Sequence, residues 1–241
     1  MEFGTTAFWL ALAQIIWINI LLSGDNAVVI ALAARSLPPK RQKQAIMIGS
    51  GAAIVMRVAL TLVAAQLLEL PWLKMLGAAL LLYIGVTLVL PEDESEGEGG
   101  ESSAGMFVAV RTILIADLVM SLDNVIAVAA AAKGSTLLLV IGLAMSIPLV
   151  VFGSTLLLKV IERFPLIVWF GAALLGFIAG EIVVSDPALA GTLPALQEAL
   201  GMDEHRLGQV AGIVGALLVV GIGRLLLKRR LAAHAAASPH N

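Results

Sequence analysis

The chain has 241 residues, of which 60% are hydrophobic and only 13% are charged. A typical soluble domain carries about 25% charged residues, so the composition excludes an ordinary soluble domain. There are no cysteines, which excludes disulfides, thiolate metal sites and thiol catalysis. The formal net charge of −2 argues against a nucleic-acid partner.

Apolar runs long enough to cross the hydrocarbon core of a bilayer as helices recur along the chain. We therefore predict an all-α polytopic membrane protein with seven transmembrane helices. The predicted spans cover residues 7–33, 44–68, 72–90, 107–131, 135–158, 165–184 and 207–227.

The basic residues predict the orientation, because cytoplasmic loops of membrane proteins carry an excess of Lys and Arg. With the N-terminus outside, only Lys74, Lys133 and Arg206 fall on the outer side. The basic residues then on the cytoplasmic side are Arg35, Lys40, Arg41, Lys43, Arg111, Lys159, Arg163, Lys228, Arg229 and Arg230. We predict an N-out, C-in topology in a bacterial inner (cytoplasmic) membrane.

The chain contains an internal repeat. A motif of sequence Ser-x-Asp-Asn occurs at 23–26 and again at 121–124, and residues 77–85 resemble residues 171–179. Each copy holds three spans, so the two copies insert upside down relative to each other, as in many transporters. The predicted segments are a first three-helix repeat (1–90), an acidic flexible cytoplasmic linker (91–106), a second three-helix repeat (107–185), an extracytoplasmic loop (186–206), a seventh helix (207–230) and a cytoplasmic tail (231–241).

Small residues at helical spacing occur in the last two spans. Gly176 and Gly180, and likewise Gly208 and Gly212, have GxxxG spacing. This spacing lets two helices approach closely, and we expect packing within the chain rather than a dimer contact.

The repeated motif places polar groups where lipid-spanning helix is expected. An aspartate at the centre of a membrane helix costs about 2.5–3.5 kcal/mol on insertion scales, so a carboxylate retained in both copies points to function. In the second copy the spacing of Asp117, Ser121 and Asn124 puts them on one helix face. Asn19, Ser23 and Asn26 have the same spacing in the first copy.

Asp25 and Asp123 lie off these polar faces and can join them only where the helix opens. Gly24 favours such a break in the first copy. Leu122 takes the place of that glycine in the second copy, which weakens the case for a break there.

The polar groups of the spans form a set of hard oxygen and amide ligands without cysteine or histidine. Such a set suits Mn²⁺, Mg²⁺ or Ca²⁺ and disfavours Cu⁺ and Zn²⁺. Arg57 is expected to act as a counter-ion, with Glu181 as its suggested partner. The surplus of carboxylate charge over one divalent ion indicates that metal is exchanged for protons. The candidate residues are Asp25, Asp117, Asp123 and Glu181, with Asn19, Asn26, Asn124, Ser23, Ser121 and Arg57 around them.

The segments 22–30 and 117–125 resemble the paired Asp-Asn motifs of the TerC integral membrane family, most of all those of its short bacterial branch. The resemblance covers spans one to six and extends to span seven. It implies a metal transporter, with manganese efflux as the expected activity. Larger family members carry further spans or cytoplasmic domains that this chain lacks. By resemblance, the metal-binding positions are Asp25, Asn26, Asp117, Asp123 and Asn124, with Glu181 as an additional one.

We therefore expect a secondary transporter that exports Mn²⁺ as its substrate, with Ca²⁺ and Mg²⁺ left open. The protein is not expected to be an enzyme, to carry an organic cofactor or to bind nucleic acid; its partners are the metal ion, membrane lipid and, as an open question, further copies of itself. Two alternatives remain. One is an exporter of cationic amino acids or amines, and the other is a membrane factor that delivers metal to secreted enzymes.

Overall fold

The computed structural model describes residues 5–21, 24–67, 69–90, 103–132 and 135–237. Within these ranges every regular element is helical, which confirms the all-α prediction for that part of the chain. In chain order the elements are α1 (Thr6–Leu21), α2 (Gly24–Ala34), α3 (Pro39–Leu67), α4 (Leu73–Val89), α5 (Ser103–Ala132), α6 (Thr136–Ala144), α7 (Ser146–Arg163), α8 (Leu166–Val184), the 3₁₀ helix η3 (Pro187–Leu189), α9 (Leu193–Leu200) and α10 (Glu204–Ala237).

Four helical stretches are long and apolar enough to cross a membrane. Shorter apolar stretches occur in α1, α2 and α4. These features are those of a polytopic membrane protein, while the number of crossings and the orientation stay predictions. The four long stretches are Pro39–Thr61, Gly105–Leu122, Leu166–Val184 and Glu204–Ala232.

Two of the predicted spans are each built from two helices. The span predicted at 7–33 contains α1 and α2, and the span predicted at 135–158 is divided at Met145 between α6 and α7. Pro148 explains the second division, because proline has no N–H to donate and its ring displaces the carbonyl four residues earlier, that of Ala144. The segment predicted as a loop at 186–206 contains the short helices η3 and α9.

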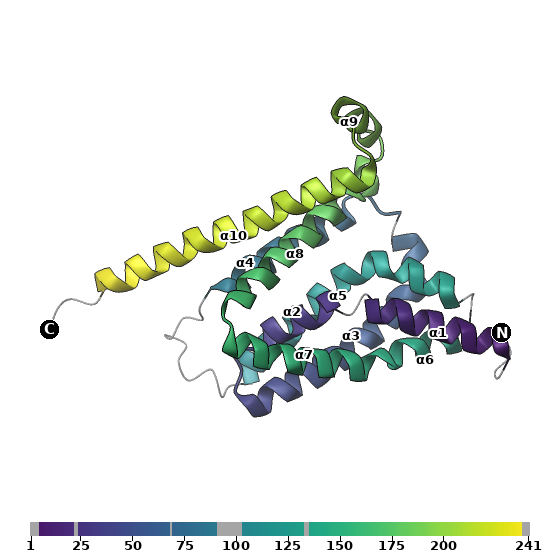
Figure 1. The fold of residues 1–241 in the computed structure, drawn as a ribbon, viewed down its shortest axis with the longest axis horizontal. Helices are drawn as coiled ribbons and strands as arrows, with labels where there is room; N and C mark the ends of the chain where they lie inside the picture. Colours follow the sequence, from purple (N-terminus) through teal and green to yellow (C-terminus); the bar gives the residue numbers. More distant parts are fainter. Residues whose placement is uncertain (1–4, 22–23, 68, 91–102, 133–134, 238–241) are drawn as a thin grey trace.

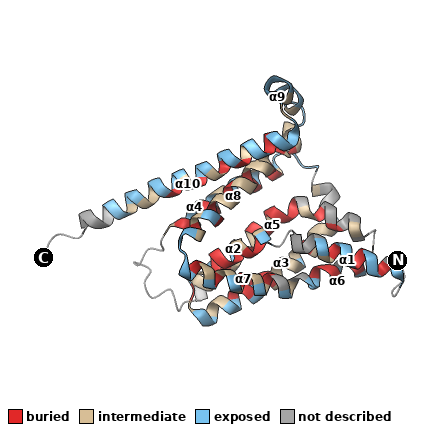
Figure 2. Cartoon of the chain, viewed as in Figure 1, coloured by how far each residue is buried: buried red, intermediate tan, exposed pale blue. Residues whose placement is uncertain are grey.

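The helices form two layers (Figure 1). In one layer α4, α8 and α10 lie side by side, and each contacts the other two. The other layer contains α1, α2, α3, α5, α6 and α7, with α5 in contact with α1, α2, α3, α4 and α6. Figure 2 shows buried residues concentrated on α2 and α5 and a largely exposed outer face on α10. The packed centre of the protein therefore lies around α2 and α5.

Helices from the two predicted repeats pack on each other through glycines. A Cβ atom on Gly49 of α3 would lie 2.8 Å from Cδ1 of Ile113 on α5. A Cβ atom on Gly142 of α6 would likewise clash with Ile15 of α1. Ile15 and Ile113 are separated by the same offset of 98 positions as the repeated motif. The two contacts are thus counterparts, each joining the first span of one repeat to the second span of the other.

The contact between α8 and α10 is made by backbone rather than side chains. A Cβ atom on Gly180 would clash with the carbonyl oxygen of Ala211, and one on Gly176 would clash with the backbone of Gly215. Only glycine permits this approach, so the expected packing role is confirmed for Gly176 and Gly180. Gly212 is also in close contact, with Phe177, whereas a Cβ atom on Gly208 would come only within 4.0 Å of Glu181.

The Asp186 side chain joins the start of α4 to the segment that follows α8. Its Oδ1 accepts hydrogen bonds from the N–H of Trp72 (2.9 Å) and Ala188 (2.8 Å), and its Oδ2 accepts one from Met75 N–H (3.0 Å). The side chain is buried, with the residue 2% exposed. Burial alone raises the pKa of this carboxyl, but the backbone N–H groups of Ala188, Trp72, Met75 and Lys74 hold the pKa below its ordinary value.

We expect Gly180→Ala to lower the thermal stability of the detergent-solubilised protein, because the new methyl group forces α8 and α10 apart. Overpacking against backbone that cannot rotate away should cost about 3 kcal/mol. Gly221→Ala is the matched control, since nothing lies within 4 Å of a Cβ atom there. A melting temperature reduced equally by both substitutions would show that close approach of α8 and α10 is not the cause.

Asp186→Ala should lower the free energy of unfolding by at least about 2 kcal/mol, because it leaves several buried N–H groups without an acceptor. Asp203→Ala, which removes an exposed cap of α10 with one hydrogen bond to Arg206 N–H (2.8 Å), should cost about 1 kcal/mol or less. The pKa of Asp186 is lower in the folded protein than in the unfolded chain, where it is about 3.9. The carboxylate therefore contributes its full stabilisation of the fold above the unfolded pKa and loses it as the pH falls through the folded pKa. Thermal unfolding measured against pH should therefore show the difference between wild type and Asp186→Ala shrinking in acid. A difference that does not change with pH would contradict this.

Candidate functional site

The first Asp-Asn motif lies at a junction between two helices. α1 ends at Leu21 and α2 begins at Gly24, with Asp25 in the first turn of α2. Oδ1 of Asp25 accepts a hydrogen bond from Asn26 N–H at 2.7 Å. Asp25 is thus a half-buried carboxylate in the first turn of α2, and Ser23 lies outside the described residues.

The second Asp-Asn motif lies in an uninterrupted helix. α5 runs from Ser103 to Ala132 and carries Asp117, Ser121 and Asn124 on one face. No opening occurs at Leu122, so the two motifs differ in backbone structure although their sequences repeat. In this copy the side chains, and not freed carbonyls, are the available ligands.

The most deeply buried polar contact of the site is an ion pair between α3 and α5. Nη2 of Arg57 donates to Oδ1 of Asp117, and Ser121 Oγ donates to Oδ2 of the same carboxylate at 3.2 Å. Arg57 and Asp117 are each 6% exposed and Ser121 is fully buried. The suggested pairing of Arg57 with Glu181 is therefore wrong. The sequence placed both groups in apolar helices, and only the packing of α3 against α5 shows which carboxylate is near.

Asp25 lies close enough to this ion pair to interact with both of its members. The structure thus brings together three charged groups from α2, α3 and α5. The two carboxyl groups and the guanidinium come from three different helices. Asn26, next to Asp25, is 4% exposed, and Asn124 is half-buried on α5.

Two predicted site residues are described only by their backbone. Asp123 lies within α5 and Asn19 within α1, but their side chains lie outside what the structure describes. Among the described residues, no group of three or more His, Asp or Glu side chains is arranged to hold a metal ion. The assignment of Asp123 as a ligand therefore stays a prediction, and a complete metal site requires its carboxylate.

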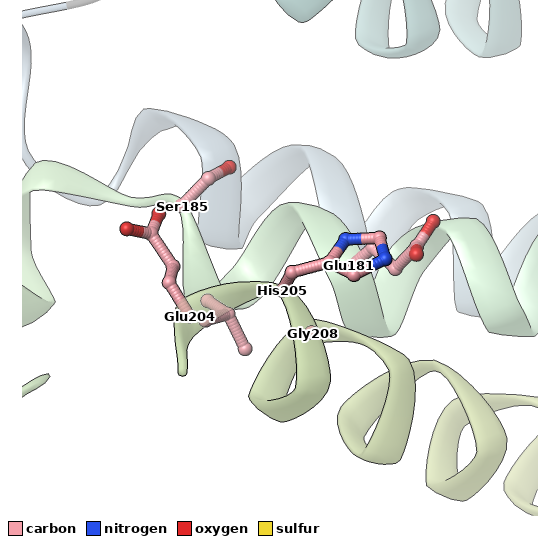
Figure 3. A pocket seen from close by; sticks show the side chains of 6 residues that line it. Glu181, Ser185, Glu204, His205 and Gly208 are labelled. Carbon is pink, nitrogen blue, oxygen red and sulfur yellow. The ribbon is translucent and has the colours of Figure 1, made fainter. Parts of the chain in front are cut away.

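Glu181 belongs to a different cluster. It lines a pocket of about 410 Å³ between the end of α8 and the start of α10, together with Ser185, Glu204 and His205. Figure 3 shows Glu181 and His205 close together and Glu204 turned away from them. His205 is exposed. The structure does not place Glu181 beside Asp25, because α8 presents this residue to α10.

Little in the sequence points to this second cluster. Glu204 and His205 follow a polar loop, and Glu181 is the only acidic residue of its predicted span. The available signal was the position of all three residues near the ends of the predicted spans six and seven, which the segment 186–206 connects.

Comparison with known proteins agrees with the resemblance found in the motifs. A profile of the integral membrane protein TerC family matches residues 4–230. The membrane protein YjbE of Bacillus subtilis is 43% identical over 183 residues, which are 76% of this chain and 83% of YjbE. YceF of the same organism is 26% identical over 71% of this chain and 69% of its own.

More distant similarity extends to larger proteins. The inner membrane protein YoaE of Escherichia coli is 28% identical over 138 residues, covering 50% of this chain and 27% of YoaE. No solved structure matches the chain. The profile match over most of the length and the identity to YjbE show that the chain belongs to the integral membrane protein TerC family.

Proposed function

We propose that this protein is a secondary transporter that exports a hard divalent cation, Mn²⁺ first among them, across the bacterial cytoplasmic membrane. The observation that carries the proposal is Asp25, a carboxylate at a helix junction within an apolar layer, in electrostatic range of the buried Asp117 and Arg57. Intramembrane carboxylates in such positions commonly mark ion pathways.

The arrangement of the helices supports a transporter built from two inverted halves. Helix α3 packs against α5, and α2 packs against α7, so each of these contacts joins a helix of the first predicted repeat to one of the second. The contact between α4 and α8 joins the third helices of the two repeats. The counterpart glycine contacts at Gly49 and Gly142 follow the same scheme. In inverted-repeat transporters the substrate site lies where the halves meet, often at a discontinuous helix. The junction of α1 and α2 beside α5 fits that description.

The chemistry of the site favours a small cation stripped of water. Ser121 is fully buried and Asp117 nearly so, which leaves little room for an organic ammonium group. Carboxylate, hydroxyl and amide oxygens suit Mn²⁺, Mg²⁺ and Ca²⁺. The preference for Mn²⁺ and the outward direction rest on the family resemblance. The name of the relative YoaE, an inner membrane protein, supports the location.

Asp25→Asn and Asp123→Asn should each reduce Mn²⁺ flux into proteoliposomes by at least about tenfold, because each removes a charged ligand while preserving shape. Glu198→Gln is the control, since Glu198 lies on the exposed helix α9 and should transport like wild type. Flux measured with a Mn²⁺-sensitive dye checks this. Unchanged flux in both aspartate variants would reject the site, and a wild type that moves no divalent cation would reject the transporter.

Flux should also respond to a pH gradient across the proteoliposome membrane. When the metal leaves, carboxylates in a low-dielectric site favour protonation, so metal movement one way is coupled to proton movement the other way. A compartment made acidic on the side opposite to the metal should accelerate uptake, and a protonophore should remove the acceleration. Equal rates with and without the gradient would contradict proton exchange.

A further inference from the structure

The ion pair between Arg57 and Asp117 has no charged counterpart in the other half of the protein. By the offset of 94 positions that relates the later parts of the repeats, Arg57 corresponds to Val151. By the offset of 98 that relates the motifs, Asp117 corresponds to Asn19. Each half thus contributes one member of a single pair, and the equivalent positions are neutral. A purely structural need for charge at this contact would be expected in both halves.

Buried ion pairs rarely stabilise a protein more than well-packed apolar residues would, because both charges lose their hydration. Here Arg57 and Asp117 are each 6% exposed, so the loss of hydration is nearly complete. The neutral residues at the corresponding positions of the other half indicate that this fold does not require the pair. Its retention calls for a role beyond holding α3 to α5.

The guanidinium of Arg57 is incompletely satisfied in its present position. It contacts Asp117 through Nη2, and Nε is buried without a hydrogen-bond partner among the described residues. A forked two-bond arrangement, which gives arginine–carboxylate pairs their strength, is not formed through Nε. A pair held in this way can be exchanged for another partner more readily than a fully bonded one.

The position of Asp25 determines what that other partner is. Asp25 lies in the first turn of α2, and α2 packs against both α3 and α5, the helices that carry the ion pair. A cation bound between Asp25 and Asp117 would therefore meet the positive charge of Arg57. The metal ion and the guanidinium cannot both contact the Asp117 carboxylate in a low-dielectric region, because their positive charges repel each other. Arginine keeps its charge over the whole physiological pH range, so it cannot relieve the conflict by losing a proton.

We propose that Arg57 competes with the transported cation for Asp117. The guanidinium pairs with Asp117 while the site holds no metal and withdraws when the metal binds. This inference rests on the proposed transport function and defines Arg57 as a positioning residue that sets affinity. The competitor weakens metal binding and speeds release. It also compensates the charge of Asp117 while no metal is bound.

The test measures Mn²⁺ binding to the purified protein by calorimetry and Mn²⁺ flux in proteoliposomes. Arg57→Gln should bind Mn²⁺ at least about tenfold more tightly than wild type and transport it more slowly, because the competitor is gone and release is impeded. Arg57→Lys keeps a positively charged side chain at this position, so its affinity for Mn²⁺ should be closer to that of wild type than to that of Arg57→Gln. Arg206→Gln, at the exposed start of α10, is the control for loss of a positive charge elsewhere. Folded Arg57→Gln protein whose Mn²⁺ affinity is unchanged or weaker would overturn the proposal.

A second comparison answers the same question if Arg57→Gln does not fold. Asp117→Asn leaves Arg57 free to pair with Asp25, so this variant should bind Mn²⁺ poorly. Adding Arg57→Met to it removes the competitor and should restore binding by about tenfold. Equal affinity in the single and double variants would overturn the proposal. A wild type that neither binds nor transports Mn²⁺ would overturn the transport function as well, whereas normal wild-type transport with unaffected Arg57 variants would overturn the competitor alone.

Discussion

The buried pairing of Arg57 with Asp117 constrains the centre of this protein more than any other contact. A guanidinium placed among apolar helices must have an anion beside it, since an isolated buried charge is far more costly than a paired one. That requirement fixes α3 against α5 at one register. It also draws together the two halves of the chain, because each helix belongs to a different repeat. The helix junction before Asp25 is then held beside the same charges.

Around this centre the halves pack by steric fit rather than by polar contacts. Membrane helices gain no hydrophobic driving force from contact with each other, so close approach through glycine is their main source of attraction. Gly49 and Gly142 supply it between the halves, and Gly176 and Gly180 supply it between α8 and α10. Among the described residues, the buried polar side chains of α2 and α5 are Asn26, Asp117 and Ser121.

Much of the helical architecture can be predicted from the sequence. The length of each apolar run, and the point at which it ends before a charged loop, are local properties of the sequence. The spans predicted for α3, α4, α5 and α8 agree with the observed helices within a few residues at most ends. The division at Met145 was missed although Pro148 was visible, since proline is tolerated in many membrane helices. The partner of Arg57 was also missed. The repeat offsets show which helices correspond, but they do not show which side chains meet across the halves, and Val151 at the equivalent position gave no hint of Asp117.

The length of α10 has a consequence for how deeply the protein sits in its bilayer. Arg206 and Lys228 on this helix are separated by 22 residues, or about 33 Å of helix, which is close to the hydrocarbon thickness of about 30 Å. Between them Arg224 lies over the ring of Trp169 at 5.8 Å, an arrangement suited to the interface. α10 therefore has the length at which its charged ends would lie at the two surfaces of a bilayer. Its close glycine contacts with α8 join that length to the layer of α4, α8 and α10.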